Sequence, residues 1–491
     1  MRRVAAVVSV LCIATGLWRL ESERAGLSIT PLAIGTTPAT VYQLAGGTKA
    51  PAVIIAHGFA GSRQLMEAYA LTLARAGYVA VSFDFEGHGR NPTPMSGDVT
   101  RIDGTTQLLI REIGRVTDAV LALPSVDGQI ALLGHSMASD IIVRRAMIDP
   151  RVAATVVISM FSEAVTSNRP SNLLIISGEW EPFLRTNALL NVRLANPSAS
   201  EGETVGDPTS STGRRAIVAP HVEHVGVLYS STALREAREW LDVVFGRSDT
   251  SPVASTGGPI VLLLLGIVIL AWPLARALPR SDAAATALPT HMFLVAALVP
   301  AALTPVILTF VDTRFLPVLV ADYLTAHLLL YGAIALGLMM WSGVRIGPIS
   351  WASALALAVY GIFVFGGALD RYVASFTPST PRLPIILAIA IGALPYMLAD
   401  SLLTLGGRAT VWRVLVVRGA FFASLALAVA LDFKRLFFLL IIVPVILLFF
   451  TIFGLMGGWV GRRTGSPGAI GIGLGLILAW ALDVSFPMFA P

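Results

Sequence analysis

The second half of the chain is built from apolar runs long enough to cross a lipid bilayer. Each is close to the roughly 20 residues that a membrane-spanning helix needs. The runs cover residues 257–278, 291–311, 317–341, 349–368, 383–405, 412–431, 436–457 and 468–487. We therefore predict an all-α, polytopic transmembrane domain of about eight helices over residues 255–491.

The N-terminus predicts one more membrane segment. Met1-Arg2-Arg3 precedes an apolar stretch from Val4 to Trp18. Leu20-Glu21-Ser22-Glu23-Arg24 follows, and this stretch offers no small-x-small signal for cleavage. We predict an uncleaved signal anchor over residues 1–22, with a cleaved signal peptide as the alternative.

Between these apolar regions the composition is that of a globular domain. The whole chain of 491 residues is 55% hydrophobic and only 13% charged, which is too apolar for an ordinary soluble protein. Residues 23–254 are mixed in character and numerous enough for one domain with a sizeable core.

Arginines between the apolar runs predict the orientation. If the N-terminus is cytoplasmic, the loops on its side are the richer in basic residues, as the positive-inside rule requires. These are Arg276, Arg280, Arg345, Arg408, Arg413, Arg462 and Arg463, against Arg314, Arg371, Arg382, Lys434 and Arg435 on the other side. We predict a multi-pass protein of the cytoplasmic membrane with residues 23–254 outside the cytoplasm.

The remaining composition limits the partners. The net charge of +5 suits anionic lipid, and no basic run with interleaved aromatics points to nucleic acid. Cys12 is the single cysteine, so a disulfide or thiolate metal cluster within one chain is excluded. The sequence predicts no cofactor or metal, leaves protein partners open, and makes the lipid bilayer the expected surrounding.

Short apolar runs alternate with helical patterns in the globular region. This alternation predicts a mostly parallel, doubly wound sheet covered by helices on both faces. The expected strands are 52–56, 79–83, 130–133, 153–159, 172–177 and 215–219, and the expected helices are 69–76, 105–123, 139–148 and 232–245.

One of these strands runs into Gly134-His135-Ser136-Met137-Ala138. A serine held on a tight strand-to-helix turn between small residues has its hydroxyl clear of the backbone, as in a nucleophile elbow. Alanine at 138 departs from the usual glycine.

Four stretches together resemble the α/β-hydrolase superfamily over residues 50–246. They are His57-Gly58-Phe59-Ala60-Gly61-Ser62, Asp84-Phe85-Glu86-Gly87-His88-Gly89, the elbow at Ser136, and Gly178-Glu179-Trp180-Glu181 with His224. The resemblance implies an α/β-hydrolase fold and a serine, acid and histidine in that chain order. Only about a dozen residues separate the strands at 153–159 and 172–177, so we expect no large cap over the site.

The resemblance assigns a role to each candidate. Ser136 is the expected nucleophile, and His224 is the expected base that removes its proton. His221 is the competing base. Glu181 stands three residues after Gly178, where the family keeps its acid.

Glu179 and Asp207 remain alternative acids. The backbone N–H groups of Phe59 and Met137 are the expected oxyanion donors. We expect His57 and His88 to stabilise turns and His135 to pack beside the elbow.

Ionisable residues within the apolar runs are costly there and point to polar paths or pairs. They are Asp322, His327, Asp400 and Arg418. An interfacial position explains Asp322, Asp400 and Arg418 equally well, whereas His327 falls mid-span. Gly471, Gly473 and Gly475 lie in another run, where small residues allow close helix packing.

The sequence predicts a membrane-anchored serine hydrolase. It would cleave an ester, thioester or amide of a small-molecule or lipid acyl substrate through an acyl-enzyme, at the outer side of the cytoplasmic membrane. The alternatives are a transporter or channel-like protein with a non-catalytic hydrolase-like binding module, and an acyltransferase using the same serine.

Overall fold

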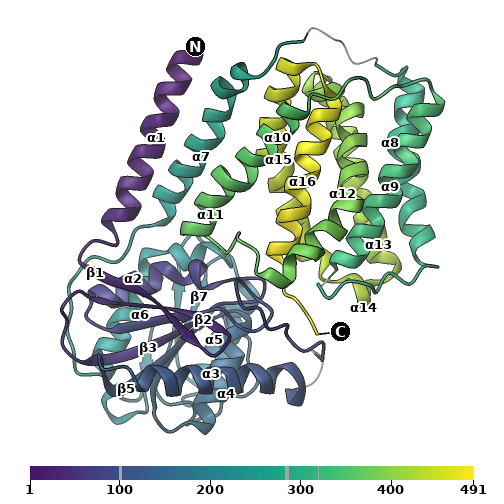
Figure 1. Ribbon diagram of the computed structural model, residues 1–491. Helices are drawn as coiled ribbons and strands as arrows, with labels where there is room; N and C mark the ends of the chain where they lie inside the picture. Colours follow the sequence, from purple (N-terminus) through teal and green to yellow (C-terminus); the bar gives the residue numbers. More distant parts are fainter. Residues whose placement is uncertain (99–101, 282–286, 319, 491) are drawn as a thin grey trace. The chain divides into compact units, whose positions relative to one another are not determined.

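The computed structural model describes residues 1–98, 102–281, 287–318 and 320–490 (Figure 1). The chain forms two compact units. We call the first the membrane unit; it contains Met1–Ala14, Leu262–Ala368 and Phe376–Phe486. The second contains Thr15–Val261, Leu369–Ser375 and the C-terminal residues from Pro487; we call it the hydrolase unit after the family that its sequence resembles.

Nine strands form one sheet among the described residues of the hydrolase unit. Its order is β1-β2-β4-β3-β5-β6-β7-β9-β8. The strands are β1 (Leu27–Ile34), β2 (Thr37–Leu44), β3 (Ala50–Ala56), β4 (Val79–Phe83), β5 (Val126–His135), β6 (Val152–Ile158), β7 (Leu173–Gly178), β8 (Thr204–Val205) and β9 (Arg214–Ala219). The central pairs from β4 to β9 are parallel, and β1, β2 and β8 pair antiparallel at the two edges.

Helices cover both faces of this sheet. They are α2 (Glu67–Arg75), α3 (Gln107–Leu121), α4 (Met137–Ile148), α5 (Pro182–Arg193) and α6 (Ser231–Val244). Successive residues of a strand point to opposite faces. In β3, Val53 and Ile55 therefore belong to the core that includes α2 and α6, while Ile54 belongs to the core of α3 and α4. The prediction of a doubly wound, mostly parallel sheet is confirmed.

The hairpin of β1 and β2 and the short β8 were not expected from the sequence. In β1, Leu27 and Ile29 pack against one core, whereas Leu32 and Ile34 pack against the other. The alternation thus changes phase near Pro31, and the strand is half-exposed. Because of this change of phase and this exposure, the edge strand contains no continuous apolar run that would predict it.

Two short segments from the far end of the chain belong to the hydrolase unit. The Met95 N–H donates to the Met488 carbonyl over 2.8 Å, and the Met488 N–H donates to the Gly87 carbonyl over 2.8 Å. Asp370 forms an ion pair with Arg90. The compact unit therefore contains residues outside the predicted range of 23–254.

The membrane unit consists of long apolar helices. Among the described residues, nine helices are long and apolar enough to cross a membrane. This number includes α1, whose last residues belong to the other unit. Their principal segments are α1 (Arg2–Ser22), α7 (Gly257–Leu274), α8 (Thr290–Leu308), α9 (Ala321–Trp341), α10 (Trp351–Val359) with α11 (Gly366–Tyr372), α12 (Leu383–Leu403), α13 (Val411–Leu431), α15 (Leu439–Thr464) and α16 (Pro467–Ser485). These spans indicate a multi-pass membrane protein.

Gly471 and Gly475 of α16 lie against α12, and Gly473 lies against Ala354 and Leu357 of α10. A methyl group placed on Gly471 would come within 2.6 Å of the Leu398 Cα atom, and one on Gly475 within 3.0 Å of the Leu394 Cα atom. These backbones approach too closely for side chains between them. The packing role predicted for these glycines is confirmed.

The ionisable residues of the spans are paired or lie near helix ends. Asp400 is buried, with its Oδ1 atom 3.6 Å from Arg418 Nε. His327 is fully buried, with Nε2 3.1 Å from Ser424 Oγ. Asp322 lies in the first turn of α9, which agrees with an interfacial position.

Candidate active site

The turn between β5 and α4 holds Ser136 in a strained conformation. Its φ is 53° and its ψ is −118°, a region that residues with side chains seldom adopt. A methyl group on Gly134 would lie 3.1 Å from the Ala138 carbonyl oxygen and 3.0 Å from a methyl of Ile142. Small residues on both sides of Ser136 therefore allow the tight turn, and alanine fits at position 138.

Ser136, His224 and Glu181 form one hydrogen-bonded chain. His224 follows β9, and its Nε2 atom lies 2.9 Å from Ser136 Oγ. Its Nδ1 atom lies 2.5 Å from Glu181 Oε1, after β7. The three side chains come from the carboxyl ends of β5, β7 and β9, which meet at one edge of a parallel sheet. The structure thus brings the three predicted site residues together.

The second oxygen of Glu181 is also held. Oε2 accepts hydrogen bonds from the Gly178 N–H and from the Ser159 hydroxyl, each over 2.7 Å. Burial alone raises the pKa of a carboxyl, but the hydrogen bonds from His224, Gly178 and Ser159 outweigh it and lower the pKa of Glu181. Glu181 is therefore a fixed anion beside the imidazole.

Ser159 is not among the site residues that the sequence predicts. It directly follows β6, with φ of 53°, at the same sheet edge as the other three residues. A hydroxyl immediately after a buried parallel strand is the signal that could have found it.

The alternative residues are engaged elsewhere. The side chain of His221 is 84% exposed, and its Nδ1 atom lies 3.3 Å from Glu179. Asp207 caps a short 3-10 helix (Pro208–Ser210) by accepting a hydrogen bond from the Thr209 N–H. Neither arrangement includes Ser136.

The loop after β3 approaches the elbow closely. A methyl group on Gly58 would come within 2.9 Å of Ser136 Cβ, so this loop needs glycine at its contact with the nucleophile turn. Phe59 is the next residue. Met137 is the first residue of α4, where a backbone N–H has no acceptor within the helix. Both predicted oxyanion donors are therefore in segments that adjoin Ser136.

Two buried histidines support these loops. His57 contacts the Gly58 carbonyl through Nδ1 over 2.8 Å and accepts from the Phe85 N–H through Nε2 over 3.1 Å. Burial lowers its pKa to about 4, so it is neutral at pH 7. His135 contacts the His224 carbonyl through Nε2, over 2.9 Å, and its ring lies 4.8 Å from that of His224. Both have the supporting positions predicted for them.

Exposed aromatic side chains flank the acid residue. We call Phe161, Trp180 and Phe183 the aromatic rim. They are 49%, 62% and 66% exposed, and the rings of Phe161 and Phe183 stack with centroids 5.9 Å apart. Between β6 and β7 the chain is fully described and contains no helix, as expected for a domain without a large cap. The rim is therefore open to an apolar ligand.

Comparison with protein families supports the hydrolase fold. Residues 47–188 match a family model described as serine aminopeptidase, S33. This stretch contains Ser136 and Glu181. Together with the sheet topology, the match identifies an α/β-hydrolase fold, followed in the chain by long apolar helices.

Three similar solved structures are distant in sequence. An epoxide hydrolase from Vigna radiata is 21% identical with a TM-score of 0.22, over 28% of this chain and only 39% of its own. A predicted CIB-like hydrolase from Thermoplasma acidophilum is 13% identical with a TM-score of 0.34, over 44% of this chain and 97% of its own. A hypothetical protein from Pseudomonas aeruginosa is 16% identical with a TM-score of 0.32, over 44% and 92%. No curated protein matches the chain.

Proposed function

We propose that the chain is a membrane-anchored serine hydrolase that cleaves an ester, thioester or amide through an acyl-enzyme. The observation that carries this proposal is the hydrogen-bonded chain from Ser136 Oγ through His224 to Glu181. A serine hydroxyl is a weak nucleophile at neutral pH unless a base removes its proton as it attacks.

The arrangement supplies each step of acyl transfer. Ser136 Oγ bonds to the substrate carbonyl carbon while its proton passes to His224 Nε2, and the carbonyl oxygen becomes an oxyanion. The N–H groups of Phe59 and Met137 stabilise that charge. When the oxyanion collapses, the leaving group takes the proton from His224. Water then attacks the acyl-enzyme by the same route and releases the acid.

Glu181 keeps the imidazole in the useful tautomer. Its carboxylate accepts a hydrogen bond from the Nδ1–H of His224, which leaves Nε2 free to accept a hydrogen bond from the Ser136 hydroxyl. The negative charge also stabilises the imidazolium that forms during attack. The low pKa of Glu181 keeps this charge in place.

The aromatic rim favours substrates with an apolar acyl chain. Phe161, Trp180 and Phe183 are exposed within two residues of Ser159 or Glu181. Burying such side chains against an acyl chain removes apolar area from water, at about 25 cal/mol per Å². The description of the matched family adds peptide amides to the candidate substrates.

A panel of p-nitrophenyl esters, thioesters and aminoacyl anilides tests this function. The purified full chain should turn over at least one class, and Ser136→Ala should abolish the activity. Phe183→Ala should raise KM for long acyl chains more than for acetate, while Leu190→Ala, also exposed but outside the rim, serves as the matched control. Activity that persists in Ser136→Ala would contradict the proposal.

We further propose that the hydrolase domain lies at the outer side of the cytoplasmic membrane. The bias of arginines between spans supports this orientation. A membrane-impermeant maleimide should label Ser248→Cys on intact cells and Ser281→Cys only after permeabilisation, both positions being exposed. The reverse pattern would overturn the orientation without affecting the proposed chemistry.

Buried polar groups in the membrane unit favour transport as a second candidate function. Asp400 and Arg418 line a cavity of about 270 Å³ together with Ser401 and Thr404. Such groups in spans often line a path for ions or polar substrates. A transporter-like protein with a hydrolase-like binding module would keep its transport activity in Ser136→Ala and lose it in Asp400→Asn. An acyltransferase would differ from the hydrolase only in the acceptor that replaces water.

A further inference from the structure

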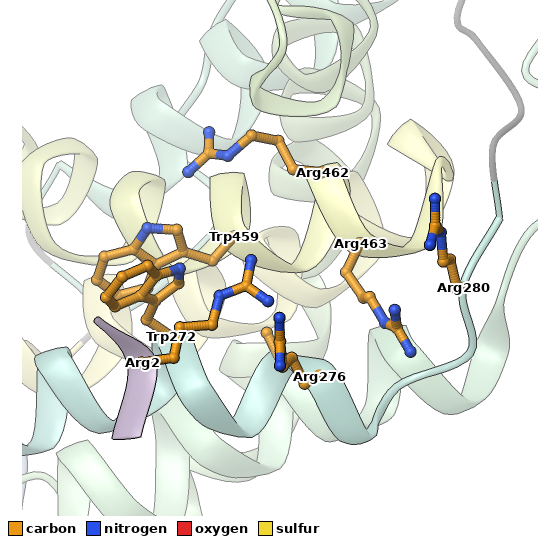
Figure 2. A pocket seen from close by; sticks show the side chains of 8 residues that line it. Arg2, Trp272, Arg276, Arg280, Trp459, Arg462 and Arg463 are labelled. Atoms are coloured by element: carbon orange, nitrogen blue, oxygen red, sulfur yellow. The ribbon is translucent and has the colours of Figure 1, made fainter. Parts of the chain in front are cut away.

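A pocket at one end of the membrane unit is lined by arginines from distant parts of the chain (Figure 2). They come from the start of α1, the chain around the end of α7, and the last turn of α15. The five are Arg2, Arg276, Arg280, Arg462 and Arg463. We call this the arginine pocket. Its volume is about 670 Å³, which falls in the range of about 300–1,000 Å³ typical of small-ligand sites.

Four of the five arginines in the pocket have no carboxylate partner in the part of the chain that the structure describes. Considering the residues that the structure describes, Arg2, Arg276, Arg462 and Arg463 form no ion pair with a carboxylate. Like charges gathered around one cavity repel one another. The five side chains line one cavity, and all but Arg463 are also exposed to solvent. An anion in that space would remove the repulsion.

Backbone contacts fix two of the guanidinium groups. Arg462 donates from Nη1 to the Gly407 carbonyl over 2.7 Å, and Arg463 donates from Nε to the Leu278 carbonyl over 3.0 Å. Each contact uses one of the five N–H groups that a guanidinium offers and restricts the direction of the rest. These side chains are thus already ordered for a ligand.

Two tryptophans form an apolar wall beside the charges. The rings of Trp272 and Trp459 are half-buried and have centroids 6.4 Å apart. The Arg2 guanidinium carbon lies 5.6 Å from the centre of the Trp272 ring. Tryptophan is enriched where a membrane meets water, because its ring is apolar and its N–H is polar. The wall suits a ligand with an anionic head and an apolar part.

We propose that the arginine pocket binds a phosphate-bearing anion. The planar guanidinium fork matches the geometry of phosphate oxygens and can bind two of them at once. Basic pockets between membrane helices commonly take the head groups of anionic phospholipids. The same chemistry would also hold a soluble phosphate ester, so the source of the phosphate is decided by experiment.

The test compares three forms of the full chain in detergent. Wild type, Arg276→Gln/Arg463→Gln and Arg345→Gln are titrated with phosphatidylglycerol, phosphatidylcholine and inorganic pyrophosphate, and bound molecules are counted by native mass spectrometry. Arg345 is exposed and outside the pocket, so its variant removes a similar charge without touching the site. We expect wild type to prefer phosphatidylglycerol to phosphatidylcholine. The double variant should bind phosphatidylglycerol at least about tenfold more weakly than wild type.

Each result has a distinct meaning. Loss in the double variant with retention in Arg345→Gln supports a lipid head-group site, and the same pattern with pyrophosphate supports a soluble phosphate ester. Equal binding by all three forms, or equal loss in both variants, would overturn the proposal. If the double variant does not fold, Arg276→Lys/Arg463→Lys keeps the charge and loses the fork; unchanged affinity in that form would also count against the site.

Discussion

Glu181 makes the contacts that most strongly support the proposed triad. One oxygen holds His224, and the other accepts from Gly178 and Ser159. All three contacts require a carboxylate, whose oxygens only accept hydrogen bonds. An amide at this position would present a donor to at least one of these groups.

We therefore expect Glu181→Gln to fold and to lose activity. Because the amide cannot stabilise the imidazolium and can favour the wrong tautomer, hydrolysis should fall by about 10³ to 10⁴-fold. Ser159→Ala removes only one hydrogen bond to Oε2 and should cost about tenfold. Steady-state kinetics of both variants checks the ranking; a larger loss in Ser159→Ala would place the key contact elsewhere.

Glu112 makes stability depend on pH. Burial raises the pKa of this carboxyl to about 7, against an ordinary value of 4.5, although it accepts from the Thr37 hydroxyl and the Glu86 N–H. Between these two values the folded state binds a proton that the unfolded state has lost. The free energy of unfolding therefore falls as pH rises from about 4.5 to about 7, by up to about 3 kcal/mol.

The test replaces the titrating group. Glu112→Gln should remove this part of the pH dependence, so that the variant gains stability relative to wild type between pH 5 and pH 8. Glu163→Gln, at an exposed carboxyl, should leave the dependence unchanged. Melting temperatures of the full chain at several pH values measure both, and parallel curves for wild type and Glu112→Gln would contradict the assignment.

At the level of helices and strands, the sequence predicts best those elements that have a local apolar pattern of their own. The apolar runs predict the long apolar helices because hydropathy is a property of each segment alone. The buried strand Ala50–Ala56 and the strand before Ser136 were found for the same reason. The edge hairpin was missed because its apolar residues serve both cores in turn, and that depends on pairing with β4.

Contacts between segments that are far apart in the chain could not be predicted from the sequence. Nothing in the local pattern of Met488 or Asp370 relates them to Met95 or Arg90. In contrast, Ser136, Glu181 and His224 could be chosen because each follows a recognisable strand, and the family order supplied the rest. Ser159 follows a buried strand in the same way, so the residue after each parallel strand is a candidate for this site.

The close contact of α16 with α12 gives a prediction about packing. Gly471→Leu would force a side chain to within 2.6 Å of the Leu398 Cα position, so the helices must separate. Overpacking of this kind costs about 1–3 kcal/mol, or a melting temperature lower by about 3–10 °C. Gly337→Leu, where an added group meets nothing within 4 Å, is the matched control. Equal melting temperatures for the two variants would refute the contact.

At the scale of the whole molecule, the hydrolase unit depends on residues far outside its continuous stretch. Three backbone hydrogen bonds join the C-terminal segment to Gly87 and Met95: Met95 N–H to the Met488 carbonyl, Met488 N–H to the Gly87 carbonyl, and Ala490 N–H to the Met95 carbonyl. Each contributes about 1 kcal/mol.

A chain ending at Phe486 should consequently be less stable. We expect the free energy of unfolding of the hydrolase unit to fall by about 3 kcal/mol. Phe489→Ala keeps the three backbone bonds and should lose less. Limited proteolysis near residues 87–95 reports the difference, and equal protection in the shortened and full-length chains would contradict it.

The proposed function requires Ser136 to be a nucleophile that His224 activates. Labelling of the purified full chain with a fluorophosphonate probe, followed by mapping of the modified residue, tests this most directly. We predict labelling at Ser136 that disappears in Ser136→Ala and falls sharply in His224→Ala, while His221→Ala is labelled like wild type. A folded wild-type chain that takes no label, or labelling that survives Ser136→Ala, would contradict it.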